Sequence, residues 1–320
     1  NAHFRVLSEI NRGVYEILIA FICPFIIAAN CVAMLIMTRK ELRSTYNFVF
    51  FLIAIDQTVV MTTMCLSFLR AVLFSYCSPG FLSLSWALFD LIVLANLMPL
   101  CKAHATWLAG IYLYFNAFMI KDVRGLQLGK NTVLMLLCVS TLFVIVTNIP
   151  TILSYTVQWV PYQDVCNSTV YGDLMVPFAR ESDVLYENDC LMLMLGSILT
   201  GSIHSAIACV LLFAFTIGLL LFLREVRKKR KMMVLHTTSR ESPDRNRTTT
   251  LFILIMVTTV ISEFPLALLG MLEGFISFQL RFLVTHKLSL LFTSLMIITS
   301  SVNLFVYLFM SKNFREVRIF

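Results

Sequence analysis

The sequence predicts an all-α membrane protein in which seven spanning helices form one bundle. Of its 320 residues, 59% are hydrophobic and only 13% are charged, whereas a soluble domain carries about 25% charged residues. Seven apolar runs each reach the length of about 20 residues at which a helix crosses about 30 Å of hydrocarbon. Because backbone polar groups in lipid must be satisfied internally, we expect helices rather than open strands.

The seven runs define the expected spans of a single domain that covers residues 1–320. The third run is the longest, so we expect its helix either to tilt or to extend into the cytosol. The runs cover about residues 17–37, 48–74, 85–120, 132–155, 191–223, 249–272 and 286–309.

Lysine and arginine gather in alternate connections between the spans, and this asymmetry predicts the orientation of the chain. The connection between the fifth and sixth spans is the most basic and includes Arg227, Lys228 and Arg247. By contrast, the connection over 156–189 contains Arg180 as its single basic residue. We therefore expect the basic side to be cytoplasmic and the N-terminus to lie outside the plasma membrane. The net charge of +7 is then a topology signal, and the partner it implies is the lipid bilayer rather than a nucleic acid.

The connection over 156–189 is the longest segment on the expected outer side, and it is acidic. Acidic residues at the outer entrance to the bundle raise the local concentration of cationic ligands. Ordinary solvation of a loop explains the same residues equally well. The acids are Asp164, Asp173, Glu181, Asp183, Glu187 and Asp189.

The outer loops carry two further features of cell-surface proteins. Asn167 begins an Asn-Ser-Thr glycosylation sequon on the expected outer side. Cys77, Cys166 and Cys190 lie in or beside outer loops, where disulfides persist. Three cysteines allow one bridge and leave one over, and the pairing stays open.

Ionisable residues inside membrane spans are functional candidates because they are costly in hydrocarbon. Arg70 lies near the outer end of the second span, and the third span contains Asp90, Lys102 and His104. Arg70 and Asp90 could instead extend to the outer interface. Lys102 and His104 could be structural hydrogen-bond partners between helices.

Asp56 lies near the middle of the second span and needs polar partners at that depth. Asn30 and Asn303 lie at similar depth in the first and seventh spans. Such a polar group could hold water or a sodium ion.

Glu263 lies two residues before Pro265 in the sixth span. A proline inside a helix frees a backbone carbonyl one turn earlier and kinks the helix. An acid beside the kink, on the interior face, can contact a ligand and bend the cytoplasmic half of the helix. If it is buried and unpaired, the acid is protonated rather than charged.

Several short stretches occur in order along the chain, namely TRKELRSTYN, SWAL, TWLAG, DRNRTTTLFILIMV, SEFP and SSVNLFVYLFMSKNFREV. Together they resemble rhodopsin-like G-protein-coupled receptors. Within that class the chain is most similar to invertebrate FMRFamide-type neuropeptide receptors, particularly the myosuppressin and sex-peptide group, and nematode class-W serpentine receptors are nearly as similar. The resemblance covers nearly the whole chain and implies a seven-helix bundle with a short amphipathic eighth helix over 311–319.

The resemblance implies roles for the polar residues of the spans. Glu263 stands where most such receptors carry a tryptophan switch, so it resembles the floor of the ligand pocket. The other expected pocket residues are Arg70, Asp90, Lys102, His104 and Phe264. The expected switch and ion-site residues are Asn30, Asp56, Pro265, Asn303 and Tyr307. Ala105 stands in place of the serine that usually completes the ion site.

Two positions depart from the family pattern. Asn116, nine residues after Trp107, stands where the family carries an arginine that contacts the G protein. Asparagine has no charge and cannot form a bidentate ion pair, so coupling to a heterotrimeric G protein is expected to be weakened, altered or absent. Asp90 and Leu91 stand where the family usually has a cysteine bonded to the second outer loop. The expected transducer contacts are Asn116, Arg227, Lys228 and Arg247.

The expected function is that of a G-protein-coupled receptor for an extracellular, FMRFamide-like amidated peptide. One alternative is a chemoreceptor for small molecules, and another is a diverged receptor with weak or no coupling. The sequence shows no nucleophile–base spacing, metal-ligand cluster or phosphate-binding loop, so we expect neither an enzyme nor a bound cofactor or metal.

Overall fold

A computed structural model describes most of the first five predicted spans and a part of the seventh. The described backbone comprises residues 13–38, 45–74, 78, 82–121, 130–166, 174–185, 187–214, 217–218, 220–221, 224, 257, 261, 264–265, 268, 288 and 290–300. Some side chains within these ranges, including those of 112–121, are outside the description. The predicted span 249–272 therefore falls almost wholly outside the described residues, and the predicted eighth helix falls wholly outside them.

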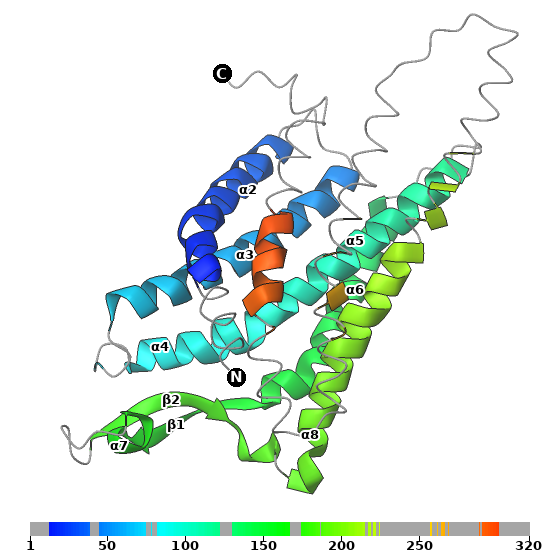
Figure 1. Ribbon diagram of the computed structural model, residues 1–320. Coiled ribbons are helices and arrows are strands. Elements are labelled where there is room, and N and C mark those ends of the chain that lie inside the picture. Colours follow the sequence, from blue (N-terminus) through cyan, green and yellow to red (C-terminus); the bar gives the residue numbers. More distant parts are fainter. Residues whose placement is uncertain are drawn as a thin grey trace, which may run out of the picture.

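Long helices run side by side to form the bundle (Figure 1). The first rod consists of η1 (Leu18–Ile22) and α2 (Cys23–Met37), and the second is α3 (Thr45–Leu73). The third is a continuous rod of α4 (Leu84–Phe89), η3 (Asp90–Leu97) and α5 (Met98–Lys121). The fourth is α6 (Lys130–Leu153), and the fifth begins with α8 (Glu187–Ile198) and η5 (Leu199–Ile207).

Within the described part of the chain, four helices are long and apolar enough to cross a membrane. They are Gly13–Met37, Phe51–Leu73, Leu84–Ile111 and Leu134–Leu153. Two shorter apolar helices are Ser202–Ala214 and Leu290–Ser300. Each of the six overlaps a predicted span, and the fold is that of an all-α membrane protein.

Hydroxyl side chains inside the rods bond to the backbone of their own helix. The Thr58 hydroxyl donates to the Ala54 carbonyl at 2.7 Å, and the Thr63 hydroxyl donates to the Val59 carbonyl at 2.8 Å. Such bonds to the preceding turn remove the need for water. These residues therefore tolerate hydrocarbon, where an unsatisfied polar group is costly.

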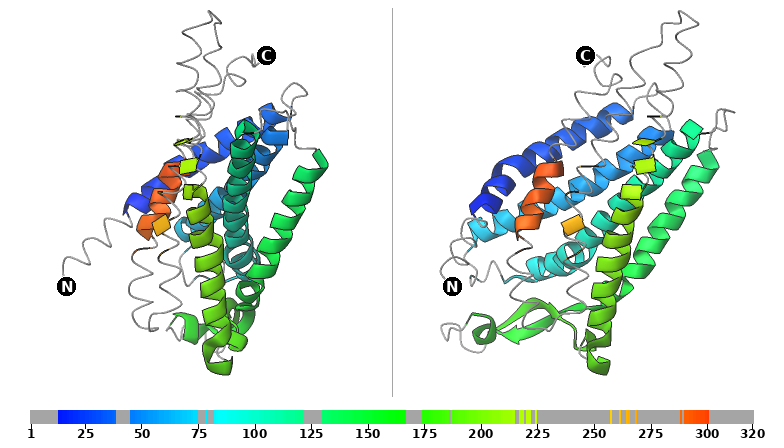
Figure 2. Two further views of the ribbon diagram at one scale, coloured as in Figure 1. Left: turned by 90° about the vertical axis from the view of Figure 1, so that its right-hand side faces the viewer. Right: turned by 45° about the vertical axis from the view of Figure 1, so that its right-hand side comes forward.

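The first, second, third and seventh spans share a buried core. α2 packs along α3, and α3 packs along α5. The helix Leu290–Ser300 lies beside α2 and α3 in both views of Figure 2. The buried residues of this core are Ile19, Cys23, Ile26, Val60, Met61, Met64, Cys101, Met296 and Ile297.

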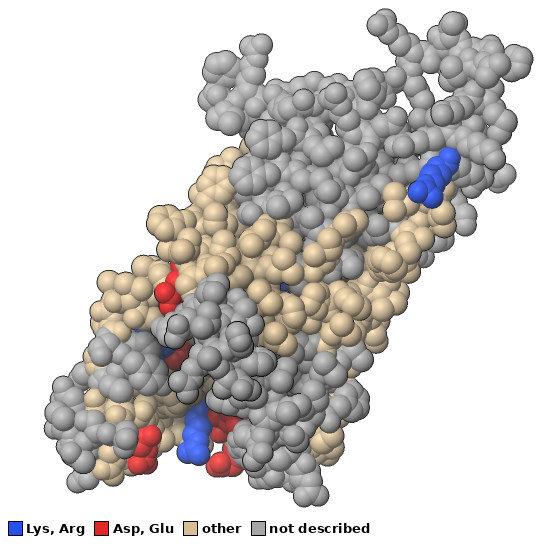
Figure 3. All heavy atoms as spheres, viewed as in Figure 1, with Lys and Arg blue, Asp and Glu red and all other residues tan. Residues whose placement is uncertain are grey.

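The outward surface of the rods is apolar. Phe21, Leu35 and Leu73 are 73%, 69% and 71% exposed. In Figure 3 most of the described charged side chains lie toward the ends of the molecule, and the described surface between them is mainly uncharged. Because soluble proteins rarely expose apolar patches above a few hundred Å², this surface is the one that lipid covers.

A β-hairpin lies across one end of the bundle, which we call the hairpin end (Figure 1). β1 (Tyr155–Pro161) pairs antiparallel with β2 (Met175–Glu181) in the register Tyr155↔Glu181 to Pro161↔Met175. α7 (Tyr162–Cys166) follows β1, and the 3-10 turn η4 (Asp183–Leu185) follows β2.

The hairpin is fixed to the start of the third rod. Tyr162 and Val176 are buried against Leu82, which precedes α4. The sequence analysis does not anticipate this hairpin, although β1 is rich in aromatic and β-branched residues that favour strands. The hairpin has open edges. The requirement that every backbone polar group be satisfied internally, which excludes open sheet edges, applies only inside the hydrocarbon.

Three of the described rods contain a π-helical segment: η1, η3 and η5. Such segments are uncommon and occur frequently at functional sites. Asp90 begins η3, and His204 lies in η5. The polar side chains of the spans therefore coincide in part with the irregular turns.

Candidate functional site

Arg70 and Asp90 form an ion pair between the second and third rods, in which one guanidinium nitrogen contacts both carboxylate oxygens. Arg70 Nη1 lies 2.7 Å from Asp90 Oδ1 and 2.6 Å from Asp90 Oδ2. The Arg70 side chain is 9% exposed, and that of Asp90 is 26% exposed. The sequence analysis predicts both residues for the ligand pocket and leaves extension to the interface open. The structure brings them together, so that each charge is neutralised by the other.

An aromatic cluster lies beside this ion pair. The Arg70 guanidinium lies 5.2 Å from the centroid of the Trp86 ring. Phe74 and Phe89 each meet Trp86 edge to face, with centroids 6.4 Å and 5.4 Å away. A planar guanidinium packs on an aromatic face better than an ammonium does, so arginine suits this position.

Asp56 finds its partner in the third rod. His104 Nδ1 lies 2.8 Å from Asp56 Oδ2, and both side chains are largely buried. The Cys101 thiol also hydrogen-bonds to Asp56. The sequence analysis predicts His104 for the ligand pocket, whereas the structure places it beside the acid of the predicted ion site.

His104 is hydrogen-bonded through both ring nitrogens. The Asp56 carboxylate is an acceptor, so His104 Nδ1 carries a proton and donates it to Oδ2. Thr141 in α6 donates its hydroxyl proton to the Leu137 carbonyl at 2.8 Å, and its oxygen lies 3.0 Å from His104 Nε2. His104 therefore links α3, α5 and α6.

Asn30, predicted as a member of the same polar group, is buried in α2. Its Nδ2 has no hydrogen-bond partner within the described part of the chain. Asn303, the other predicted member, lies outside the described residues.

A second buried histidine, His204 in η5, joins the third, fourth and fifth rods. Trp107 Nε1 donates to His204 Nδ1 at 3.2 Å. His204 Nε2 lies 2.7 Å from Thr147 Oγ1 and 3.1 Å from Asn148 Nδ2. Phe143 lies edge to face against both the Trp107 and the His204 rings.

These contacts make His204 neutral. An indole N–H is only a donor, so His204 Nδ1 must accept and carries no proton. The proton then lies on Nε2 and is donated to Thr147, whose own hydroxyl donates to the Phe143 carbonyl at 2.6 Å. Asn148 uses its amide on the Val144 carbonyl at 2.7 Å.

The sequence analysis does not single out His204. The signal was present, because His204 is an ionisable residue inside the apolar run 191–223, and such residues are functional candidates by default. Trp107 was noted only as part of the TWLAG motif.

Lys102, another predicted pocket residue, is partly buried in α5. Within the described residues no ion pair involves it. Phe264 is 43% exposed, and Pro265 is partly buried.

The remaining predicted site residues fall outside what the structure describes. The backbone at Asn116 and Cys190 is helical, but their side chains are outside the description. The residues that are not described at all are Cys77, Asn167, Arg227, Lys228, Arg247, Glu263, Asn303 and Tyr307. Cys166, in α7, is bonded in a disulfide.

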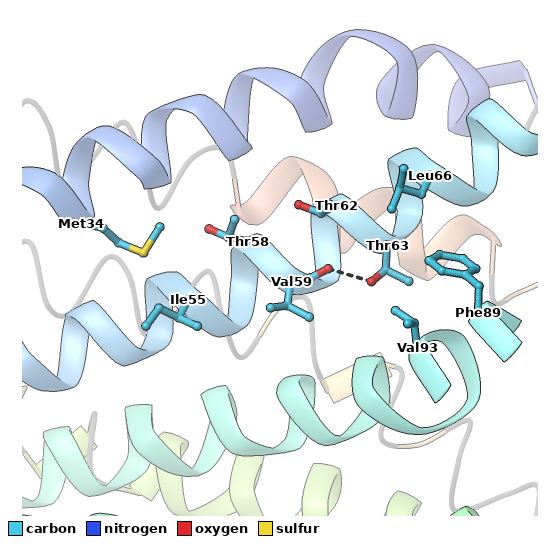
Figure 4. Close-up of a pocket in the computed structure, with 9 residues that line it drawn as sticks. All are labelled: Met34, Ile55, Thr58, Val59, Thr62, Thr63, Leu66, Phe89 and Val93. Atoms are coloured by element: carbon cyan, nitrogen blue, oxygen red, sulfur yellow. Dashed lines mark hydrogen bonds between the residues drawn. The ribbon is translucent and has the colours of Figure 1, made fainter. Parts of the chain in front are cut away.

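A groove of about 330 Å³ runs along α3 between α2 and η3 (Figure 4). Its lining includes Ile55, Val59, Leu66, Phe89 and Val93. Two of its threonine hydroxyls are already bonded to their own helix. Among the described residues that line it there is no predicted ligand-pocket residue and no charged group for a cationic ligand.

The described helices are those of a multi-pass helical membrane protein. Residues 15–319 match the family of serpentine type 7TM GPCR chemoreceptors, Srw, and the chain belongs to that family. It is similar to the G-protein coupled receptor dmsr-1 of Caenorhabditis elegans, with 24% identity over 351 aligned positions that cover 98% of this chain and 69% of the relative. The family is one of receptors, and its members cross the membrane seven times.

Proposed function

We propose that this chain is a plasma-membrane receptor for an extracellular, FMRFamide-like amidated peptide. The peptide enters from the hairpin end, which faces outward together with the N-terminus, and its binding opens the cytoplasmic face to a heterotrimeric G protein. The family gives the class of protein. The peptide ligand rests on the motif resemblance and on the chemistry of the hairpin end.

The acidic character of the hairpin end carries the proposal. Asp164 in α7, Glu181 in β2 and Asp183 in η4 gather there around a single described arginine, Arg180. Figure 3 shows acidic side chains at this end of the molecule. The hairpin packs on the start of the third rod, so this negative surface adjoins the bundle. An acidic surface of this kind attracts a cationic peptide.

Inside the bundle, contacts between side chains reduce the number of predicted pocket residues that are available to a ligand. Arg70 and Asp90 neutralise each other, and His104 is taken by Asp56. Lys102, Glu263 and Phe264 are then the predicted pocket residues that we assign to the ligand. Glu263, beside Pro265, transmits binding to the cytoplasmic half of the sixth helix.

On the opposite side of the membrane, Asn116, Arg227, Lys228 and Arg247 form the proposed contact with the G protein. Asn116 supplies no charge there, so coupling depends more heavily on the basic residues between the fifth and sixth helices. On the outer side, Asn167 carries a glycan.

G-protein activation in cells that express the full chain tests this proposal. The ligands are a panel of amidated peptides ending in Arg-Phe, with the same peptides as free acids for control. We expect a response to amidated peptides, and a lower potency in the double variant Glu181→Gln/Asp183→Asn because the attracting charge is removed. Asn116→Arg is measured beside the wild type and is expected to increase the maximal response. Silence of both receptors toward every peptide, with surface expression confirmed, contradicts the proposal.

A chemoreceptor for small molecules is the second candidate, because the matching family is described as one of chemoreceptors. It predicts activation by small organic compounds and no loss of potency when Glu181 and Asp183 are neutralised. The same cells and sensor, challenged with a small-molecule panel, separate the two candidates.

A further inference from the structure

The resemblance to rhodopsin-like receptors implies a sodium ion at the acid of the second span, which is Asp56. Such an ion is hard and is bound by oxygen ligands from carboxylates, carbonyls, hydroxyls and water. The fit of this chain to sodium therefore depends on which atoms surround the Asp56 carboxylate.

The described neighbours of Asp56 do not suit sodium. A ring nitrogen of His104 lies 2.8 Å from Oδ2, and the next partner is the sulfur of Cys101. Ala105 offers no side-chain oxygen where related receptors carry a serine. The hydroxyl of Thr141 is occupied, since its proton goes to the Leu137 carbonyl and its oxygen faces His104 Nε2.

His104 also fills the position that sodium would take. Its Nδ1–H donates to Asp56 Oδ2 at 2.8 Å, and both side chains are largely buried. A sodium ion at this carboxylate would displace a buried hydrogen bond and leave the ring nitrogen without an acceptor, which is costly. The His104 ring also reaches Thr141, so it holds α3, α5 and α6 together with a tether that no ion from solution replaces.

We propose that the Asp56 site of this receptor binds no sodium ion, because the Nδ1–H of His104 occupies the place of the cation. The receptor is therefore indifferent to sodium, and the Asp56–His104 pair stabilises the bundle in any salt. This holds whichever ligand the receptor takes and whether or not it couples to a G protein.

The wild-type receptor provides the first test. The purified full chain in lipid nanodiscs is unfolded by heat in sodium chloride and in N-methyl-D-glucamine chloride of equal ionic strength. A ligand that binds the folded state alone raises the midpoint of unfolding as its concentration rises. We expect equal midpoints in the two salts at every concentration. A rise specific to sodium that disappears in Asp56→Asn overturns the proposal.

A double-mutant cycle provides the second test, in sodium-free buffer. Asp56→Asn and His104→Gln are each expected to lower the midpoint of unfolding. The double variant is expected to lose much less than the sum of the two single losses, because the two changes remove the same interaction. Asp90→Asn with His104→Gln is the matched control, since Asp90 pairs with Arg70 and the two losses are expected to add. Additive losses for Asp56 and His104 overturn the pairing. Neither test involves ligand or G protein, so failure here is distinct from failure of the proposed function.

Discussion

His104 and His204 both lie between helices of the same bundle, yet their partners place a proton on opposite ring nitrogens. His104 donates from Nδ1 to the Asp56 carboxylate, and its Nε2 faces the oxygen of Thr141. His204 accepts at Nδ1 from the Trp107 indole and donates from Nε2 to Thr147, so it is neutral. The acceptors and donors aimed at each ring decide which nitrogen carries a proton.

The two histidines also join different parts of the bundle. His104 connects α3, α5 and α6, whereas His204 connects α5, α6 and η5. A hydrogen bond between neutral groups contributes less than one to a charged group, and His104 bonds to a carboxylate. The contrast predicts that variants around His104 are more damaging than matched variants around His204.

The largest effect is expected for Asp56→Ala. This change leaves the His104 Nδ1–H buried without its carboxylate acceptor, and a hydrogen bond to a charged group contributes about 1.5–3 kcal/mol. Thermal unfolding of the purified receptor measures the loss. Asp183→Ala, at an exposed site of the hairpin end, is the control and is expected to change stability by less than about 0.5 kcal/mol. Equal losses in the two variants would contradict the pairing.

The smallest effect is expected for Trp107→Phe. The phenyl ring keeps the edge-to-face contact with Phe143, whose centroid lies 5.2 Å from that of Trp107. The change removes only the donor to His204, so we expect a loss of about 0.5–1.5 kcal/mol. Trp107→Ala, which also removes the ring, serves as the comparison and is expected to lose more. If Trp107→Phe and Trp107→Ala are equal, the indole hydrogen bond rather than the ring is the main contribution.

The sequence was sufficient to predict the helices and to select most of the polar residues that matter. Long apolar runs allow little besides spanning helices, and ionisable residues within them are rare enough to attract attention. Asp56, Arg70, Asp90 and His104 were therefore selected without any structure. His204 was present in the same pattern and was overlooked.

The pairing of these residues could not be read from the sequence. Each extra residue in a π-helical turn rotates the following side chains by about 100°, and η3 lies between Asp90 and His104. The faces that these residues present therefore cannot be extrapolated along an ideal helix. The hairpin was missed for a different reason, since its strands alternate weakly and are held by contact with Leu82, which is distant in sequence.

The placement of the protons on the two histidines is tested most directly by nitrogen NMR of the receptor in lipid nanodiscs, with the imidazole rings labelled with ¹⁵N. His104→Gln and His204→Gln assign the signals by loss. We expect Nδ1 of His104 to carry a proton, because it faces the Asp56 carboxylate, and Nδ1 of His204 to carry none, because it accepts from the Trp107 indole. An unprotonated Nδ1 on His104, or a protonated Nδ1 on His204, would contradict the two hydrogen-bond assignments.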